Sequence, residues 1–388
     1  MKLRIAILFG RWSLSFRKSL DLATCRTDPR GLTGSEQGCI RIAECLAAMG
    51  HDVTLHTVAA EVGQTWNGIK VSSIDEPIAP CDAVVSINEP DLLRGAPAGA
   101  FRVCEFFLND VSFCKVGFEQ HVDLFISPSA PHLNQVLTNE EWRKVEKTSD
   151  APNGKAIFTP DPSKWVVIPL GCDPERYEGV EKIPGRVVYC SSPDRGLHYL
   201  LQEWPAIKRA VPHATLHIFY RLQPWLRGFD STPFFPPIEP LRDRAAYVEE
   251  CLRRFSELPE SLGVTLRDSV SRETIEREMA QAECLAYPCS TTTWSEGFSC
   301  STLEACAAGA VPVISDCDAL GEVYGSAVLI SPRSCIDWVS EWRENVIMVL
   351  KSEKDRAELA NISKKFAAKH TWKLTTERLV EEITRRKA

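Results

Sequence analysis

The chain's architecture can be read from Trp294-Ser-Glu-Gly-Phe-Ser-Cys-Ser-Thr-Leu-Glu-Ala-Cys-Ala-Ala-Gly-Ala-Val-Pro-Val-Ile-Ser-Asp316. Two acids in it, Glu296 and Glu304, stand eight positions apart. That separation is roughly 2.2 turns at ~3.6 residues per turn, so the two acids do not share one helical face. We expect Glu296 on a loop and Glu304 inside the helix that follows it.

The ends of this helix are marked in the sequence. Ser299 and Ser301 are candidate N-caps, because a side-chain oxygen there can accept a hydrogen bond from the first backbone N–H groups. Gly309 and Pro312 end the helix before the β-branched pair Val313-Ile314. The stretch therefore predicts a loop, a helix and a buried strand.

The predicted helix begins between two carboxylates. A helix N-terminus presents N–H groups and partial positive charge, which suit a phosphate. Ionised carboxylates accept hydrogen bonds and so suit groups rich in hydroxyls. A nucleotide-sugar carries both kinds of group.

The same residues resemble a known family. The spacing of Glu296 and Glu304, the pair Gly297-Phe298 and the run from Glu304 to Ile314 resemble the donor site of retaining GT-B glycosyltransferases, most nearly the large family-4 group (glycosyl transferases group 1). The resemblance implies an α/β fold of two doubly wound Rossmann-like domains that face each other across a cleft. It implies an enzyme that moves a sugar from a nucleoside-diphosphate sugar to an acceptor hydroxyl, with retention of anomeric configuration.

Composition agrees with two globular domains. The chain has 388 residues, 44% of them hydrophobic and 25% charged. A net charge of -7 argues against general nucleic-acid binding, which usually shows a basic excess. Residues 1–44 carry eight Lys/Arg against four Asp/Glu. The segment from Arg11 to Lys18 could contact an anionic acceptor or a membrane surface, or it could line the cleft.

The order of apolar runs predicts two parallel sheets. In the first half, strand-like runs alternate with helical patterns, and a second series begins at Trp165. We predict an acceptor-side domain at 1–164, a donor domain at 165–370 with an insertion at about 222–262, and a C-terminal helix at 371–388. By resemblance, that helix crosses back to the first domain.

Fifteen cysteines stand singly, with no Cys-x2-Cys pair. Their odd number and apolar surroundings indicate buried thiols in a reducing compartment. The N-terminal apolar run from Ile5 to Phe9 is too short for a signal peptide or a bilayer span. We therefore predict a cytoplasmic protein.

Two glycine-containing loops are further candidates for donor binding. Arg195 precedes Gly196 after the apolar run Val187–Tyr189, where its forked guanidinium could neutralise a diphosphate. The family usually has a second arginine upstream, where this chain has Cys190 or Ser191. Gly34 opens the first long helix, either close to the donor or as a cap residue.

The resemblance also assigns roles within the predicted donor site. Arg195 and the helix start at Ser301-Thr302 would stabilise the departing diphosphate, and Glu304 would bind the ribose hydroxyls. Glu296 would hold the sugar's hydroxyls together with the backbone of Gly297 and Phe298. A front-face reaction without an enzyme nucleophile is generally favoured for the family, so Glu296 is predicted to position the sugar.

Fewer residues of the family pattern are found on the acceptor side than in the predicted donor site. The family often has a histidine near the acceptor, whereas this chain has Asn109 and Asp110 in that region. They are candidates for orienting the acceptor hydroxyl, with Asp110 accepting its proton; both are also common turn residues. The acceptor could be a glycan, a lipid-linked molecule or a small molecule.

No cofactor is expected beyond the donor substrate, and no metal is strictly required. Asp316-Cys-Asp318 imitates a metal signature of another glycosyltransferase fold, but follows the donor motif instead. Two other functions stay open: a nucleotide-sugar 2-epimerase of similar shape, and a non-catalytic binding protein on a glycosyltransferase fold. The sequence fixes neither the base, the sugar nor the acceptor.

Overall fold

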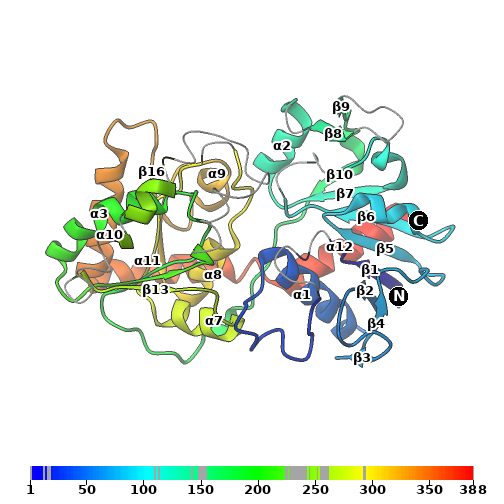
Figure 1. Cartoon of the computed structure of the whole chain (residues 1–388), viewed down its shortest axis with the longest axis horizontal. Helices are drawn as coiled ribbons and strands as arrows, with labels where there is room; N and C mark the ends of the chain where they lie inside the picture. Colours follow the sequence, from blue (N-terminus) through cyan, green and yellow to red (C-terminus); the bar gives the residue numbers. More distant parts are fainter. Residues whose placement is uncertain are drawn as a thin grey trace. The chain divides into compact units, whose positions relative to one another are not determined.

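The structure is a computed structural model that describes residues 2–11, 14, 19–108, 111, 114–140, 143–146, 155–222, 226, 243, 245–250, 252–253, 262–291 and 294–387. The chain forms two compact units (Figure 1). Unit 1 comprises Met1–Cys25, Leu32–Gly171 and His370–Ala388, and unit 2 comprises Arg26–Gly31 and Cys172–Lys369.

Unit 1 is built on one mainly parallel sheet. Its strands are β1 (Arg4–Leu8), β2 (Asp52–Thr57), β3 (Thr65–Trp66), β4 (Ile69–Ser73), β5 (Ala83–Ile87), β6 (Phe101–Glu105), β7 (Leu124–Ser127) and β10 (Trp165–Val167), with β8 (Lys144–Glu146) and β9 (Lys155–Ile157) as a separate hairpin. Its helical elements among the described residues include α1 (Gly34–Ala48), η1 (Pro90–Gly95), η2 (Phe118–His121), α2 (Ala130–Thr138), η4 (Pro162–Lys164) and α12 (Trp372–Lys387).

The strand order of this sheet is β10-β7-β6-β5-β1-β2-β4-β3, and only β3 runs antiparallel. The chain winds outward in one direction from β1 and then in the other from β5, so the order reverses between these two neighbours. The central strands are mostly apolar because helices cover both faces of a doubly wound sheet, and all five residues of β5 are buried. Ligands bind in such folds at the carboxyl ends of the strands flanking the reversal.

The helix α12 belongs to unit 1 although it follows unit 2 in the chain. It packs against α1, and the two lie side by side in Figure 1. Trp372, Leu379 and Ile383 form its buried face. A Cβ atom at Gly38 of α1 would lie 3.2 Å from the Trp372 ring, so the small residue allows the two helices to approach closely.

Unit 2 has a six-stranded, wholly parallel sheet. Its strands are β11 (Arg186–Tyr189), β12 (Thr215–Phe219), β13 (Val264–Arg267), β14 (Cys284–Tyr287), β15 (Val311–Ser315) and β16 (Leu329–Ser331). Its helical elements include η5 (Pro174–Tyr177), α3 (Leu197–Ala210), α7 (Arg272–Gln281), α8 (Cys300–Ala308), α9 (Leu320–Tyr324), α10 (Trp338–Lys351) and α11 (Glu353–Ala367).

The order β13-β12-β11-β14-β15-β16 is that of a Rossmann sheet. The winding direction reverses between β11 and β14, which pair directly through Val187 and Val188. The fold therefore directs the loop after β11 and the loop after β14 to the same place, at the carboxyl edge of the sheet.

The boundary between the two units lies after Gly171, later in the chain than the predicted 164/165. The apolar run at Trp165 was predicted to start the second series of strands, but β10 pairs in parallel with β7 and completes the sheet of unit 1. A single apolar run has no period that says which sheet it joins. Most of the insertion expected at about 222–262 lies outside the described residues, and residues 245–250 within it are helical.

Candidate functional site

The loop after β11 is fixed against the loop after β14. Gly196 has a φ of 98°, which a glycine adopts without strain, and it caps the N-terminus of α3. A Cβ atom there would lie 1.9 Å from the carbonyl oxygen of Pro288. Only glycine fits this approach, so the sequence Arg195-Gly196 brings the arginine beside the second loop.

Arg195 and Glu296 form an ion pair at this edge. The Arg195 Nη1 atom donates to Glu296 Oε2 at 2.9 Å, and Nη2 donates to the carbonyl oxygen of Ser295 at 3.2 Å. Glu296 is 4% exposed. Burial alone would lower the pKa of Arg195, but the Glu296 carboxylate and other nearby groups raise it well above its usual value. The guanidinium is thus a permanent positive charge at the end of the sheet.

Tyrosine and serine hydroxyls complete the setting of Glu296. The Tyr287 hydroxyl donates to Glu296 Oε2, and the Ser191 hydroxyl donates to the Tyr287 oxygen at 3.1 Å. Ser191 is one of the two residues, with Cys190, at the place where the family usually has a second arginine, and it extends the hydrogen bonds of the Glu296 carboxylate. Burial raises the pKa of Tyr287 well above its usual value, so this phenol stays a donor.

Asp318 holds the backbone of the Glu296 loop. Its Oδ2 atom accepts hydrogen bonds from the backbone N–H of Ser295 at 2.8 Å and of Glu296 at 2.9 Å, and from the Thr291 hydroxyl at 3.0 Å. The sequence pattern around Asp316 and Asp318 had raised the question of a metal. Across the described ranges, no group of three or more His, Cys, Asp or Glu residues could hold one. Asp318 orients the loop through these contacts, a role that sequence reasoning missed.

The helix after this loop begins as expected. Ser299 is the N-cap of α8, and its hydroxyl oxygen accepts from the Thr302 N–H at 3.3 Å. Its φ of 71° is unusual for a serine, and the Tyr324 hydroxyl steadies it by donating to the Ser299 carbonyl at 2.8 Å. Thr302 is fully buried with its hydroxyl 2.9 Å from that of Ser299. Ser301 is therefore the more accessible of the two residues proposed for phosphate contact.

The remaining loop residues lie where the motif places them. Gly297 and Phe298 are buried between Glu296 and the Ser299 cap. The Phe298 ring packs against Tyr324, with the ring centroids 5.9 Å apart. Gly309 ends α8 with a φ of 66°, as the sequence predicted.

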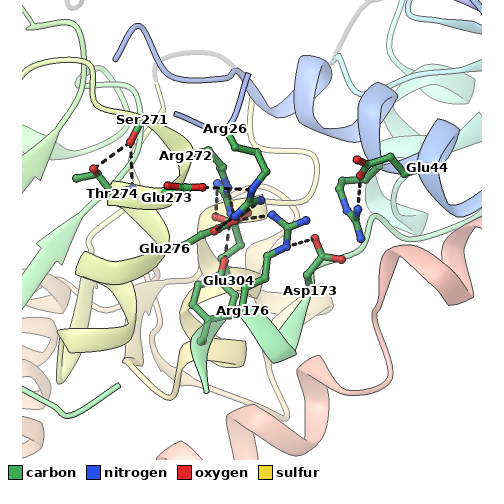
Figure 2. Close-up of polar contacts among 12 residues, drawn as sticks. Arg26, Glu44, Asp173, Arg176, Ser271, Arg272, Glu273, Thr274, Glu276 and Glu304 are labelled. Carbon is green, nitrogen blue, oxygen red and sulfur yellow. Dashed lines mark hydrogen bonds and ion pairs between the residues drawn. The ribbon is translucent and has the colours of Figure 1, made fainter. Parts of the chain in front are cut away.

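Glu304 lies inside α8 and is 5% exposed. Arg272, the first residue of α7, donates to both of its oxygens, through Nη1 to Oε2 at 3.1 Å and through Nη2 to Oε1 at 2.5 Å (Figure 2). The same Nη2 donates to the Tyr177 hydroxyl oxygen at 3.1 Å. Sequence reasoning missed Arg272, because it stands 32 positions before Glu304 in a charged helix that carries no motif.

Unit 1 holds the other candidates. Gly34 is the first residue of α1, but Thr33 is its cap: its side chain accepts from the Glu36 N–H at 3.2 Å, and Glu36 accepts from the Thr33 N–H at 2.8 Å. Asn109 and Asp110 lie outside the described residues.

The reversal point of the unit 1 sheet carries a carboxylate that sequence reasoning did not single out. Glu89 follows β5, and a Cβ atom at Gly10, just after β1, would lie 2.4 Å from a Glu89 carboxylate oxygen. The neighbouring Asn88 has a φ of 60°, and its side chain contacts Ser35 and the backbone N–H of Phe107. The sequence signal that could have identified these residues is the polar pair Asn88-Glu89 directly after the buried strand β5.

Glu105, the last residue of β6, is a buried acid in the same unit. It is 2% exposed, and neither carboxyl oxygen has a hydrogen-bond partner within the part of the chain that the structure describes. Burial raises its pKa from the ordinary 4.5 to about 8. Glu105 is therefore protonated near neutral pH.

We expect Glu105→Gln to flatten the pH dependence of stability. Between pH 4.5 and about 8 the folded carboxyl keeps a proton that the unfolded chain releases, so the free energy of unfolding falls as pH rises through this window. Glutamine removes that proton uptake. Calorimetric Tm values at pH 5 and pH 8 should differ less in the variant than in the wild type; an equal difference in both proteins would contradict the assignment.

The sequence matches no family model and no curated protein. The fold, in contrast, is similar to solved glycosyltransferase structures. AviGT4, a glycosyltransferase involved in avilamycin A biosynthesis, is 18% identical with a TM-score of 0.63, and the match covers 99% of this chain and 98% of that one. Sucrose-phosphate synthase from Thermosynechococcus elongatus is 12% identical with a TM-score of 0.62, over 99% of each chain.

A third similar structure is that of Anabaena Alr3699/HepE in complex with UDP and glucose. It is 14% identical with a TM-score of 0.60, and the match covers 99% of this chain and all of that one. These likenesses show the fold: the chain has the GT-B architecture of two Rossmann-like units, as the sequence predicted. Among the described residues, no helix combines the length and apolar character needed to cross a membrane.

Proposed function

We propose that this protein is a glycosyltransferase that moves a sugar from a nucleoside-diphosphate sugar to an acceptor hydroxyl with retention of anomeric configuration. One observation carries the proposal. Arg195 and Glu296 are paired at 2.9 Å where the unit 2 sheet reverses its winding, directly before a capped helix that contains Glu304. A cation, a helix N-terminus and two carboxylates at this edge match the parts of a nucleotide-sugar.

In the proposed reaction, the bond between the anomeric carbon and the donor phosphate oxygen breaks while the bond to the acceptor oxygen forms on the same face. The acceptor proton passes to the departing phosphate. Negative charge develops on that phosphate, so a cation already in place lowers the barrier. Arg195 supplies this cation, and its Nε–H has no acceptor among the described residues, so it remains a donor that a phosphate oxygen would satisfy.

The two carboxylates take different tasks in this proposal. Glu296 and the adjoining backbone of Gly297 and Phe298 hold the sugar's hydroxyls, with the loop kept in place by Asp318. Glu304 accepts hydrogen bonds from the ribose hydroxyls. Neither acts as a nucleophile, and no metal is invoked.

The acceptor side is assigned to unit 1, with Asn109 and Asp110 as proposed residues for a glycan, lipid-linked or small-molecule acceptor. Buried cysteines at irregular spacing suit a reducing compartment, so we place the reaction in the cytoplasm. The Anabaena structure contains UDP and glucose, which makes UDP the first donor nucleotide to test.

The test is a thermal-shift panel of UDP, GDP, ADP and CMP on the wild type and on Glu304→Gln. A nucleotide at about 100 times its Kd adds about 2.7 kcal/mol of stability, which raises the Tm measurably. We expect one nucleotide to stabilise the wild type and to lose most of that effect in the variant. No shift with any of the four would contradict a donor site in unit 2.

Catalysis needs its own measurement, because a binding protein would also pass the thermal test. Slow release of free sugar from the corresponding nucleotide-sugar without an acceptor indicates a transferase, and a pure binding protein should release none. An epimerised donor recovered from the same incubation would identify the 2-epimerase instead.

A further inference from the structure

The acid assigned to the ribose is part of an ion-pair network that joins four segments of unit 2. Arg272 contacts Glu304 in α8 and also Glu276, one turn further along α7, where its Nε donates to Oε1 at 3.0 Å. Glu276 accepts in turn from Arg26 Nη2 at 2.7 Å and from Arg176 Nη1 at 3.3 Å. Figure 2 shows Arg272 between the two glutamates, with Arg26 and Arg176 at Glu276.

Arg272 is fixed more tightly than an ordinary ion-pair partner. A guanidinium has five N–H donors. Arg272 donates four hydrogen bonds: one to Glu276, one to each oxygen of Glu304 and one to the Tyr177 hydroxyl. Its side chain is 9% exposed, and those of Glu276 and Glu304 are 6% exposed. The Arg272 guanidinium is therefore held in one orientation relative to Glu304, because any rotation would break several charge-assisted hydrogen bonds at once.

Glu276 keeps Arg272 in that arrangement. A buried carboxylate is costly unless it is neutralised, and Arg26 and Arg176 share its charge with Arg272. Arg176 is itself held by Asp173, 3.1 Å from its Nε. Arg26 comes from Arg26–Gly31, the segment of the N-terminal part of the chain that belongs to unit 2, and the N–H of Glu273 donates to its carbonyl oxygen at 3.2 Å.

We infer that Arg272 is the positioning residue of the donor site, and that Glu276 and Arg26 hold Arg272 so that Glu304 presents its carboxylate to the ribose hydroxyls in one orientation. The inference rests on the proposed function. A carboxylate accepts up to about four hydrogen bonds, so a bidentate arginine and hydroxyl groups can share it. Two neighbouring hydroxyls are recognised best by a carboxylate whose plane is already fixed, since no orientation is then lost on binding.

A positioning role for Arg272 differs from a purely stabilising one in what the lysine variant loses. Lysine keeps the charge but offers a compact ammonium without the planar fork, so it cannot hold both oxygens of Glu304 and also reach Glu276. Arg272→Lys should therefore lose the part of the nucleotide affinity that depends on the ribose hydroxyls, and keep the part that comes from the base and the phosphates.

The experiment compares the Kd of UDP with that of 2′,3′-dideoxy-UDP by calorimetry, in the wild type and in single variants. If another nucleotide gives the larger thermal shift, its own dideoxy form is used. Hydrogen bonds to a charged group make us expect wild type to prefer the ribonucleotide by about 100-fold, and Glu304→Gln to abolish most of that preference. Arg272→Lys should reduce the preference about tenfold, and Arg26→Ala about threefold, while the Kd of the dideoxy nucleotide stays within about twofold.

The matched control is Arg186→Lys. Arg186 pairs with Glu278 of the same helix α7 at 2.9 Å, and its side chain is 14% exposed. This variant should lose thermal stability as Arg272→Lys does, but keep the wild-type preference. Arg26 is 37% exposed at its side chain, so Arg26→Ala keeps the test open should Arg272→Lys fail to fold.

The outcomes separate the two proposals. If Glu304→Gln leaves the preference for the ribonucleotide unchanged, the proposed role of Glu304 is wrong, and the positioning role of Arg272 falls with it. If Glu304→Gln abolishes the preference while Arg272→Lys and Arg26→Ala keep it, the donor site stands and the positioning role is wrong. If wild type binds no nucleotide of the panel, both proposals fail.

Discussion

Replacing Glu296 with alanine should lower kcat roughly a thousandfold while the protein stays folded. The estimate corresponds to the loss of an oriented polar group at the reacting centre, for which about 10²–10³ is typical. Glu296 is held by Arg195, by Tyr287 and by the backbone contacts of Asp318, so its carboxylate has a fixed place that water cannot reproduce. The measurement is steady-state transfer with the donor that the nucleotide panel identifies.

Glu278→Ala is the control for this variant. Glu278 is a buried acid of unit 2 that also pairs with an arginine, Arg186, but it lies on α7 away from both loops at the reversal point. Its loss should leave kcat within about twofold. Unchanged turnover in Glu296→Ala, with circular dichroism like that of the wild type, would remove Glu296 from the site.

The second large effect is expected at Arg195. Arg195→Ala should reduce kcat about 10²- to 10³-fold, because the proposed reaction then lacks the cation assigned to the departing diphosphate. Binding of the nucleoside diphosphate should weaken as well, whereas binding of the nucleoside should not change. Arg195→Lys should restore part of the rate, since the ammonium keeps the charge but cannot contact both Glu296 and the Ser295 carbonyl.

The comparison of nucleoside and nucleoside diphosphate decides the role of Arg195. Equal losses for both ligands would mean that Arg195 only supports the Glu296 loop. In that case Arg195→Lys, which cannot contact both Glu296 and the Ser295 carbonyl, should recover little of the binding or the turnover.

Much of unit 2 could be predicted because its signals are local. The Ser299 cap, the Gly309 stop and the separation of Glu296 from Glu304 depend on residues a few positions apart, and the structure confirms each. Gly196 likewise predicted a turn after the strand β11, and it caps α3. Alternating apolar runs gave the parallel sheets, since burial on both faces leaves a clear pattern along the chain.

The partners of these residues could not be predicted. Arg272 meets Glu304, and Asp318 meets the Glu296 backbone, only because α7, α8 and the loop after β15 end at neighbouring places in the fold. The sequence pattern of a charged helix does not show which distant residue each side chain will contact. The run at Trp165 failed for a related reason: its apolar character indicated a strand, but the choice of sheet depends on β7, nearly forty residues earlier.

The interleaving of the two units has a consequence for how the protein is made. On the ribosome, β1 to β10 emerge first, but the face of α1 that receives Trp372 stays uncovered until all of Cys172–Lys369 has been synthesised. For unit 2, in turn, Arg26 is synthesised long before the strands of its own sheet. A nascent chain therefore exposes apolar surface for most of its synthesis, and a cut at Gly171 would yield two incomplete halves, one without α12 and one without Arg26.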